Sequence, residues 1–233
     1  MIEIGYLVSF RPQEKAGDRN YCNGVMNIPI FSIVEEENFP NIPEDAYFAF
    51  TSTTAFSIFK KKNGINGIRE PCFAVGRSTG EIMIRNGLNP VIPRIHDSMS
   101  LAETISNRVP LGSHIIIPSN SMHEIVLDHI LESTGFKVSR IYLYHYRTLE
   151  ISGEMEKLNP IDGMVFTSPG EVREFHRQTE GKYTGIRVHS IGRITANELM
   201  ELGYENAGIV GNGHFDEVMK KVCQERNNSG EWI

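Results

Sequence analysis

The sequence lacks the features that mark secreted and membrane proteins. Its three cysteines, Cys22, Cys72 and Cys223, stand far apart and form no CxxC pair. This fits a reducing compartment better than a disulfide framework, so we expect reduced thiols. No basic segment leads into an apolar one at the amino end, and the longest apolar runs, such as Ile115–Ile117, are strand-sized. We therefore expect a cytoplasmic protein without a signal peptide or a membrane partner.

A basic excess is also missing. Lys and Arg number 23 against 29 Asp and Glu, which gives a net charge of −6. A general nucleic-acid binder would be expected to carry the opposite balance, so nucleic acid is not an expected partner. With 233 residues, of which 40% are hydrophobic, the chain can build one large domain or two small ones.

Common catalytic signatures are absent as well. His123 and His129 are six residues apart rather than in HExxH spacing, and the eight histidines form no ligand cluster, so no metal site is expected. The glycine-rich segment 208–213 lacks the Gly-Lys-Ser/Thr of a P-loop and is interpreted as a loop before a helix at 214–223. No serine of the motifs below lies in GxSxG.

Two short motifs each occur twice at one spacing. Phe50-Thr51-Ser52 returns as Phe166-Thr167-Ser168, and 166 − 50 = 116. Val75–Thr79 (VGRST) returns as Ile191–Thr195 (IGRIT), and 191 − 75 = 116 as well. Because twice this spacing nearly equals the chain length, we interpret the sequence as an internal duplication.

Each motif has the pattern of a strand, a tight turn and a helix. Apolar runs precede the Thr-Ser pairs and the Gly-Arg pairs, hydroxyls follow that can cap a helix, and glycines end the helices. This pattern predicts an α/β fold with parallel sheets. The expected strands are 48–50, 164–166, 72–75 and 187–191, and the expected helices include 79–86 and 195–202.

A third strand–helix–strand unit is weaker and leaves the domain division open. Its expected elements are strands 3–10 and 25–34 around a poor helix near 12–22, and strands 113–118 and 138–146 around a helix at 123–133. Polar segments at 35–45 and 147–162 suggest linkers that would separate a central domain from one built of both chain ends. A division near residue 112 would instead give two sequential domains.

Hydroxyl and arginine side chains gather where the strands enter the helices. In an open parallel sheet, ligands bind at the carboxyl ends of the strands, beside helix N-termini that attract anions. Two such domains facing each other would line a cleft suited to carboxylates or phosphates. For any one of these residues a plain helix cap or a solvated side chain is the simpler explanation, and only the clustering favours a site. The residues are Thr51, Ser52, Thr79, Thr167, Ser168, Thr195, Arg77 and Arg193.

The order of the motifs resembles the uroporphyrinogen-III synthase family across nearly the whole chain. The motifs are Arg11-Pro12, Ile28-Pro-Ile30, the first FTS, VGRSTGEIMIRNGL, IIIPSNSMHEIVLDHI with GFKVSRIYLYHYRT, FTSPGEVREF and SIGRITANELMELGY. Each is short, and their order, spacing and double occurrence carry the resemblance.

The resemblance implies two flavodoxin-like α/β domains joined by a two-stranded linker, with a cleft between them. It favours a central domain at 46–146, a discontinuous domain at 1–36 plus 153–233, and linkers at 37–45 and 147–152. It also implies an enzyme that closes the linear tetrapyrrole hydroxymethylbilane into uroporphyrinogen III, inverting the last ring, without cofactor or metal. The substrate carries eight carboxylates, and the enzyme is expected to be a monomer.

Family positions then suggest the roles of individual residues. Thr51, Ser52, Thr79, Ser168 and Thr195 match cleft positions, while Arg11, Arg77 and Arg193 would hold carboxylates. Ser119 and Asn120 match a turn that usually contains Gly, where Asn suits a left-handed backbone. A family tyrosine, proposed to assist loss of the substrate hydroxyl, corresponds to Tyr146 or to Tyr144, and we favour Tyr146. Thr53 and Ile194 depart from the family pattern.

A second hypothesis is a binding protein without chemistry. The chain lacks a strongly catalytic constellation, which equally fits a two-domain hinge protein that closes on a small anionic ligand.

Overall fold

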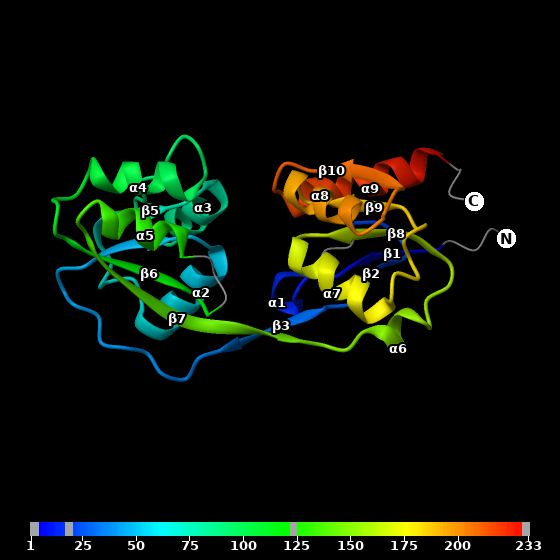
Figure 1. Ribbon diagram of the computed structural model, residues 1–233, viewed down its shortest axis with the longest axis horizontal. Helices are drawn as coiled ribbons and strands as arrows, with labels where there is room; N and C mark the ends of the chain where they lie inside the picture. Colours follow the sequence, from blue (N-terminus) through cyan, green and yellow to red (C-terminus); the bar gives the residue numbers. More distant parts are fainter. Residues whose placement is uncertain (1–4, 17–20, 122–124, 230–233) are drawn as a thin grey trace. The chain divides into compact units, whose positions relative to one another are not determined.

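The computed structural model describes residues 5–16, 21–121 and 125–229, and the chain forms two compact units (Figure 1). Unit 1 is built from both chain ends, up to Ile33 and from Arg147, and unit 2 from Val34–Tyr146. Each unit contains a five-stranded, mainly parallel sheet with helices. The predicted mixed α/β class is confirmed.

In unit 1 the strand order is β10-β9-β8-β1-β2, and every pair is parallel. The elements are β1 (Tyr6–Ser9), α1 (Gln13–Ala16), β2 (Val25–Asn27), α6 (Ser152–Met155), β8 (Ile161–Phe166), α7 (Pro169–Thr179), β9 (Val188–Ser190), α8 (Arg193–Glu201), β10 (Ala207–Val210) and α9 (Phe215–Ser229).

Alternate residues of these strands face opposite sides of the sheet. Leu7 and Val165 join an apolar cluster with Val218 of α9, whereas Val8 joins a second cluster with Phe175 of α7. Helices therefore cover both faces of the sheet, and its strands read as continuous apolar runs because both faces are buried (Figure 1).

In unit 2 the strand order is β3-β7-β6-β4-β5. The elements are β3 (Phe31–Glu35), β4 (Tyr47–Phe50), α2 (Thr53–Asn63), β5 (Arg69–Ala74), α3 (Arg77–Arg85), α4 (Ser98–Ser106), β6 (His114–Asn120), α5 (Val126–Ser133) and β7 (Lys137–Thr148). β3 and β7 are antiparallel. Glu36 N donates to Leu143 O at one end of the pair, and Leu149 N donates to Ile30 O at the other, so the numbering rises along one strand as it falls along the other. The boundary between the units falls within both strands.

The unit 2 sheet is also buried on both faces. Ala49 and Ile117 join a cluster with Leu101 of α4, while Phe50 packs edge-on against Phe56 of α2 with ring centroids 5.2 Å apart. Ala49 and Phe50 lie on β4 and Ile117 on β6, the parallel strands near the centre of the sheet.

Two expected elements need correction, and two helices were not predicted. The strand expected at 25–34 is two strands in different sheets, β2 ending at Asn27 and β3 beginning at Phe31. Pro29, which has no N–H to donate to a sheet, lies between them. The loop expected at 208–213 begins as β10, and the short helices α4 and α6 were not predicted. The expected helices near 12–22 and 123–133 fall partly outside the described residues, and His123 lies outside them.

The helices that follow the second motif begin two residues earlier than expected. Gly76 and Gly192 are the N-caps, so Arg77 and Arg193 open α3 and α8. Gly87 and Gly203 follow these helices with φ of 86° and 83°, a left-handed conformation that strongly favours glycine. The predicted C-terminal glycines are confirmed.

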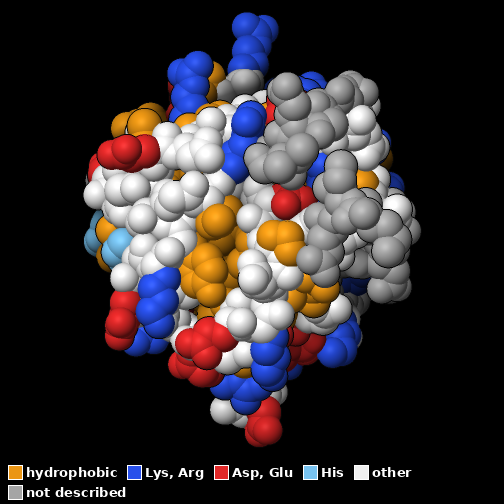
Figure 2. Space-filling model, turned by 90° about the vertical axis from the view of Figure 1, so that its right-hand side faces the viewer, with side chains coloured by type: hydrophobic (Ala, Val, Ile, Leu, Met, Phe, Trp, Pro, Cys, Tyr) orange, Lys and Arg blue, Asp and Glu red, His pale blue; other side chains and the backbone are white. Residues whose placement is uncertain are grey.

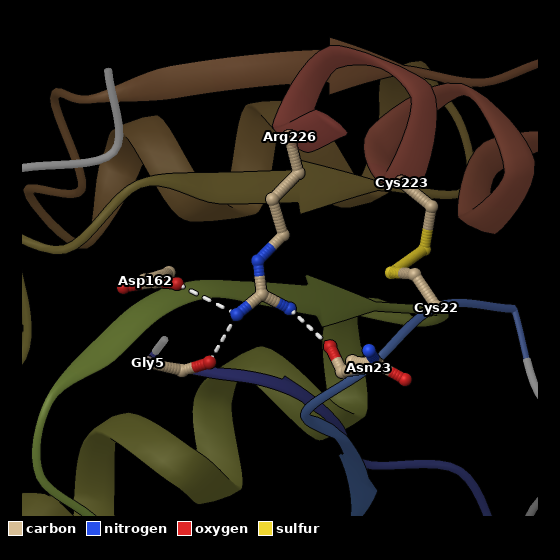
Figure 3. Close-up of a disulfide and its surroundings, with 6 residues drawn as sticks. All are labelled: Gly5, Cys22, Asn23, Asp162, Cys223 and Arg226. Carbon is tan, nitrogen blue, oxygen red and sulfur yellow. Dashed lines mark hydrogen bonds and ion pairs between the residues drawn. A yellow bond between two sulfur atoms is a disulfide. The ribbon is translucent and has the colours of Figure 1, made fainter. Parts of the chain in front are cut away.

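Cys22 and Cys223 form a disulfide, which corrects the expectation of three reduced cysteines (Figure 3). The two residues are 201 apart in sequence, yet their Cα atoms lie 5.8 Å apart because α9 packs on β1 and β8. Sequence spacing gives no sign of such a pairing, since the packing of the last helix brings the thiols together. Cys72 is free and buried.

Arg226 ties the same helix to the amino ends of the strands (Figure 3). Its guanidinium donates to the carbonyl oxygens of Gly5 and Asn23 and pairs with Asp162 at 2.8 Å. A Cβ at position 5 would collide with the Asp162 carboxylate, so the close approach requires glycine there. This arrangement and the disulfide fix the second half of α9 at the amino ends of the strands.

Reduction of the disulfide is expected to lower the free energy of unfolding by roughly 2–4 kcal/mol, since the bond closes a long loop in the unfolded chain. Urea unfolding with and without dithiothreitol measures this difference. A Cys22→Ser/Cys223→Ser variant should be equally stable in both conditions, and Cys72→Ser should keep the wild-type response. An unchanged wild-type midpoint after full reduction would contradict the expectation.

No helix within the described part of the chain is long and apolar enough to cross a membrane.

Candidate active site

The two FTS motifs stand at the carboxyl ends of β4 and β8. Ser52 is the N-cap of α2, and its hydroxyl accepts a hydrogen bond from Ala55 N at 3.0 Å. Ser168 is the N-cap of α7 and accepts from Glu171 N at 3.2 Å. Both helix starts therefore follow the predicted capping pattern, which satisfies one unpaired amide at each helix end.

The glycine turns of the second motif lie beside them. Val75 N donates to Phe50 O at 3.0 Å, and Ile191 N donates to Phe166 O at 2.9 Å, at the same offset of 116. These bonds bring the two motifs of each unit to neighbouring positions at one sheet edge.

Thr79 and Thr195 are less accessible than the sequence suggested. Both lie at the third position of their helices with buried side chains, so their hydroxyls face the protein interior. Arg77 and Arg193, at the first helical position, are exposed. A cation at the first helical position is repelled by the positive end of the helix dipole. A bound anion would therefore be stabilised by both the arginine and the helix N-terminus.

In unit 2 the structure brings together four residues expected from the sequence. The Tyr144 hydroxyl lies 3.4 Å from Ser52 Oγ, and Asn120 Nδ2 donates to it at 3.5 Å. Tyr144 is buried, and the edge of its ring meets the ring of the partly buried Tyr146 at a centroid distance of 5.5 Å. The result is a polar cluster at the carboxyl edge of this sheet.

Ser119 and Asn120 do not form the expected turn. Both belong to β6, where Asn120 pairs with Tyr144 in extended backbone, and Glu180 is the residue with positive φ among the described non-glycine residues. The strand continues because β7 is long enough to pair with it to this point. The extended backbone directs the Asn120 amide toward the Tyr144 hydroxyl.

A buried ion pair behind this cluster was not predicted. Arg140 on β7 donates Nε to Asp128 Oδ1 at 3.0 Å, pairs with the second carboxylate oxygen, and donates Nη1 to Ser119 Oγ at 2.7 Å. The side chains of Arg140 and Asp128 are only 6% and 12% exposed. The sole signal in the sequence was a charged residue within a predicted strand.

In unit 1 the donors of Thr167 are already engaged. Thr167 N and Thr167 Oγ1 donate to the two carboxylate oxygens of Glu171, each at 2.6 Å. Glu171 is buried, and burial raises the pKa of its carboxyl group, while these hydrogen bonds and the charge of Arg11 act against the rise. Glu171 was not predicted, although Ser168-x-x-Glu171 has the spacing of a capping box.

Arg11 is held at the end of β1. Its guanidinium lies 4.1 Å from the centre of the Phe215 ring, and its carbonyl oxygen accepts from Asn27 Nδ2 at 3.0 Å. Ser9 in turn donates to Asn27 Oδ1 at 2.7 Å. Burial lowers the Arg11 pKa, and the charge of Glu171 raises it, so the guanidinium stays charged near neutral pH.

Charges are mixed on the face shown in Figure 2, where basic and acidic side chains are interspersed around a small apolar area. Among the described residues, no group of three or more His, Cys, Asp or Glu side chains is arranged to hold a metal ion.

In open parallel α/β sheets, ligands bind at the carboxyl ends of the strands, and helix N-termini there attract anions. A family model described as uroporphyrinogen-III synthase HemD matches residues 21–209. The match covers well over half of the 233 residues, and the chain belongs to this family. The family consists of enzymes that cyclise hydroxymethylbilane without a cofactor.

Solved structures support the fold. The uroporphyrinogen-III synthetase of Helicobacter pylori matches with a TM-score of 0.65 and 16% identity over 98% of this chain and 100% of that chain. A variant of the uroporphyrinogen III synthase of Thermus thermophilus matches with a TM-score of 0.58 and 14% identity over 95% of this chain and 99% of that chain. A search of curated protein sequences gives no significant match.

Proposed function

We propose that the chain closes hydroxymethylbilane into uroporphyrinogen III, with inversion of the last ring, by means of the carboxyl-edge residues of both units. The observation that carries this proposal is the convergence of Ser52, Asn120 and Tyr144 at a sheet edge in a member of the synthase family. Most of the catalysis would come from positioning the substrate, which enforces attack by the last ring at its substituted carbon.

The substrate carboxylates would be held by exposed arginines and helix N-termini. Arg77 and Arg193 offer bidentate geometry beside amides that attract anions. Arg11 would take a further carboxylate at the end of β1. The hydroxyl and amide residues proposed to support substrate binding are Thr51, Ser52, Thr79, Ser119, Asn120, Thr167, Ser168 and Thr195. Of these, the buried Thr79, Ser119 and Thr195 would act by holding the surrounding backbone and side chains rather than by touching substrate.

Tyr146 is the proposed proton or hydrogen-bond donor to the departing hydroxyl. Its side chain is only partly buried, so a substrate can reach it, whereas Tyr144 is buried with its hydroxyl beside Ser52 and Asn120. Tyr144 would then support the Tyr146 ring by edge-to-face packing. Loss of the hydroxyl leaves an electrophilic azafulvene, which the last ring attacks.

We also propose that the two units are duplicated flavodoxin-like domains. The order β2-β1-β8-β9 in unit 1 corresponds to β7-β6-β4-β5 in unit 2, and the matching motifs keep their offset of 116. With β10 added, unit 1 has the flavodoxin-like strand order 2-1-3-4-5. The antiparallel strands β3 and β7 are the proposed two-stranded linker, with domain limits near 46–146 and 1–36 plus 153–233.

An isomer assay tests the function. Freshly made hydroxymethylbilane is incubated with the protein, and the type I and type III products are separated after oxidation. Uroporphyrinogen III is the expected product. Spontaneous closure gives only the type I isomer, so any type III isomer comes from the enzyme. Type I alone would reject the synthase function and favour the hinge protein that binds a small anion.

Monomeric state and cytoplasmic location stay predictions. The disulfide makes the location testable, since a reducing cytoplasm would keep Cys22 and Cys223 largely as thiols.

A further inference from the structure

Glu171 is a buried carboxylate that none of the roles above uses. It is the third residue of α7 and only 3% exposed. Both oxygens accept hydrogen bonds from Thr167. Ser9 of β1 pairs with Val165 of β8, so the segments that carry Arg11 and Thr167 leave neighbouring strands side by side, and the positive charges of Arg11 and Lys15 favour the ionised carboxylate. Burying a carboxylate is unfavourable unless it is paired, so this position is costly to fill with glutamate.

The corresponding position of unit 2 shows that helix formation there does not need a carboxylate. Because 171 − 116 = 55, the equivalent residue is Ala55, the third residue of α2, which is fully buried. Ser52 caps Ala55 N just as Ser168 caps Glu171 N, so each helix start is capped without a side chain at this position. Capping of the helix therefore does not by itself account for the glutamate.

We propose that Glu171 is a positioning residue that holds the Thr167 segment by hydrogen bonds and orients the neighbouring Arg11 guanidinium by its charge, for a substrate carboxylate. Glu171 is buried and acts through these two neighbours, without touching substrate. Phe215 and Asn27 hold Arg11 from other sides, at the ring face and at its carbonyl oxygen. An arginine fixed before binding loses less conformational entropy when it pairs with a carboxylate, which strengthens binding.

This inference rests on the proposed function and predicts an effect on binding more than on turnover. Arg11 and Glu171 belong to unit 1, whereas the proposed proton donor, Tyr146, belongs to unit 2. Loss of the carboxylate should therefore weaken the hold on one substrate carboxylate and leave the chemical step nearly intact. A merely structural role would instead lower the amount of folded, active enzyme and leave KM unchanged.

The test compares three variants in steady-state kinetics and in binding of uroporphyrin III, the stable octacarboxylic oxidation product, followed by its fluorescence. Glu171→Ala is expected to raise KM and the porphyrin Kd by about tenfold, with kcat within about twofold. Glu171→Gln should recover part of this loss, because its amide oxygen still accepts from Thr167. Glu174→Gln, on the same helix, is the matched control and should behave as wild type.

A double-mutant cycle tests whether Glu171 acts through Arg11. In an Arg11→Met background, Glu171→Ala should raise Kd by much less than it does alone. The proposal would be overturned if the effects of the two substitutions on Kd were fully additive, or if folded Glu171→Ala had unchanged KM and Kd. Either result would leave the proposed reaction intact as long as the isomer assay gives the type III product. A Kd effect in a protein that forms no type III product would retain the positioning role and reject the proposed reaction. Failure of the wild type to bind the porphyrin would overturn the positioning role.

Discussion

Replacement of Tyr146 by Phe is expected to lower kcat for uroporphyrinogen III formation by about 100-fold, the lower end of what a positioned acid contributes. The change removes only the hydroxyl, so the ring can keep its edge-to-face contact with Tyr144. KM should stay nearly constant, because substrate binding is assigned to other residues. Initial rates of type III formation, measured with spontaneous type I formation subtracted, give the value.

Tyr144→Phe is the matched control, since it removes a hydroxyl from the neighbouring ring. Ser52 and Asn120 lose a shared partner, and we expect a decrease in kcat of less than about tenfold. If both variants turned over at the wild-type rate, the acid role would be wrong, while catalysis by positioning would survive. A larger loss in Tyr144→Phe than in Tyr146→Phe would transfer the acid role to Tyr144.

Asp128→Ala is expected to lower the free energy of unfolding by about 3–5 kcal/mol, because it leaves the buried Arg140 guanidinium without its carboxylate. The hydrogen bond to Ser119 Oγ does not compensate a charge removed from water. Urea unfolding measures the loss, and the folded fraction should be determined before any activity is compared.

Two further variants distinguish the effect of the ion pair on stability from the effect of any substitution in α5. Glu132→Gln alters an exposed pair with His129 on the same α5 and should change stability by less than about 0.5 kcal/mol. A double replacement of Asp128 and Arg140 by leucine should recover much of the loss, since apolar residues of similar volume often replace a buried pair without cost. A loss below about 1 kcal/mol in Asp128→Ala would contradict the buried-pair account.

Local chemistry explains what could be predicted from the sequence. A hydroxyl ahead of an apolar helix face predicted the caps at Ser52 and Ser168, and glycine predicted the left-handed residues at 87 and 203. These features depend on neighbours within a few residues. The offset of 116 further predicted which segments are equivalent.

The features that were missed depend on contacts between distant segments. Cys22 and Cys223 meet only because α9 packs on the sheet, and Arg140 and Asp128 resemble surface charges until β7 and α5 pack together. Glu171 likewise reads as an ordinary first-turn glutamate in the sequence. Its burial beside Thr167 and Arg11 appears only in three dimensions.

The path of the chain through the two units has a consequence for biosynthesis. Residues 34–146 are continuous, so this unit can fold on the ribosome as soon as β7 has emerged. Unit 1 must wait, because β1 cannot obtain its neighbour β8 until translation passes Phe166, and Cys22 cannot reach Cys223 until the last helix is made. β1 therefore lacks its second neighbour until most of these residues have been synthesised.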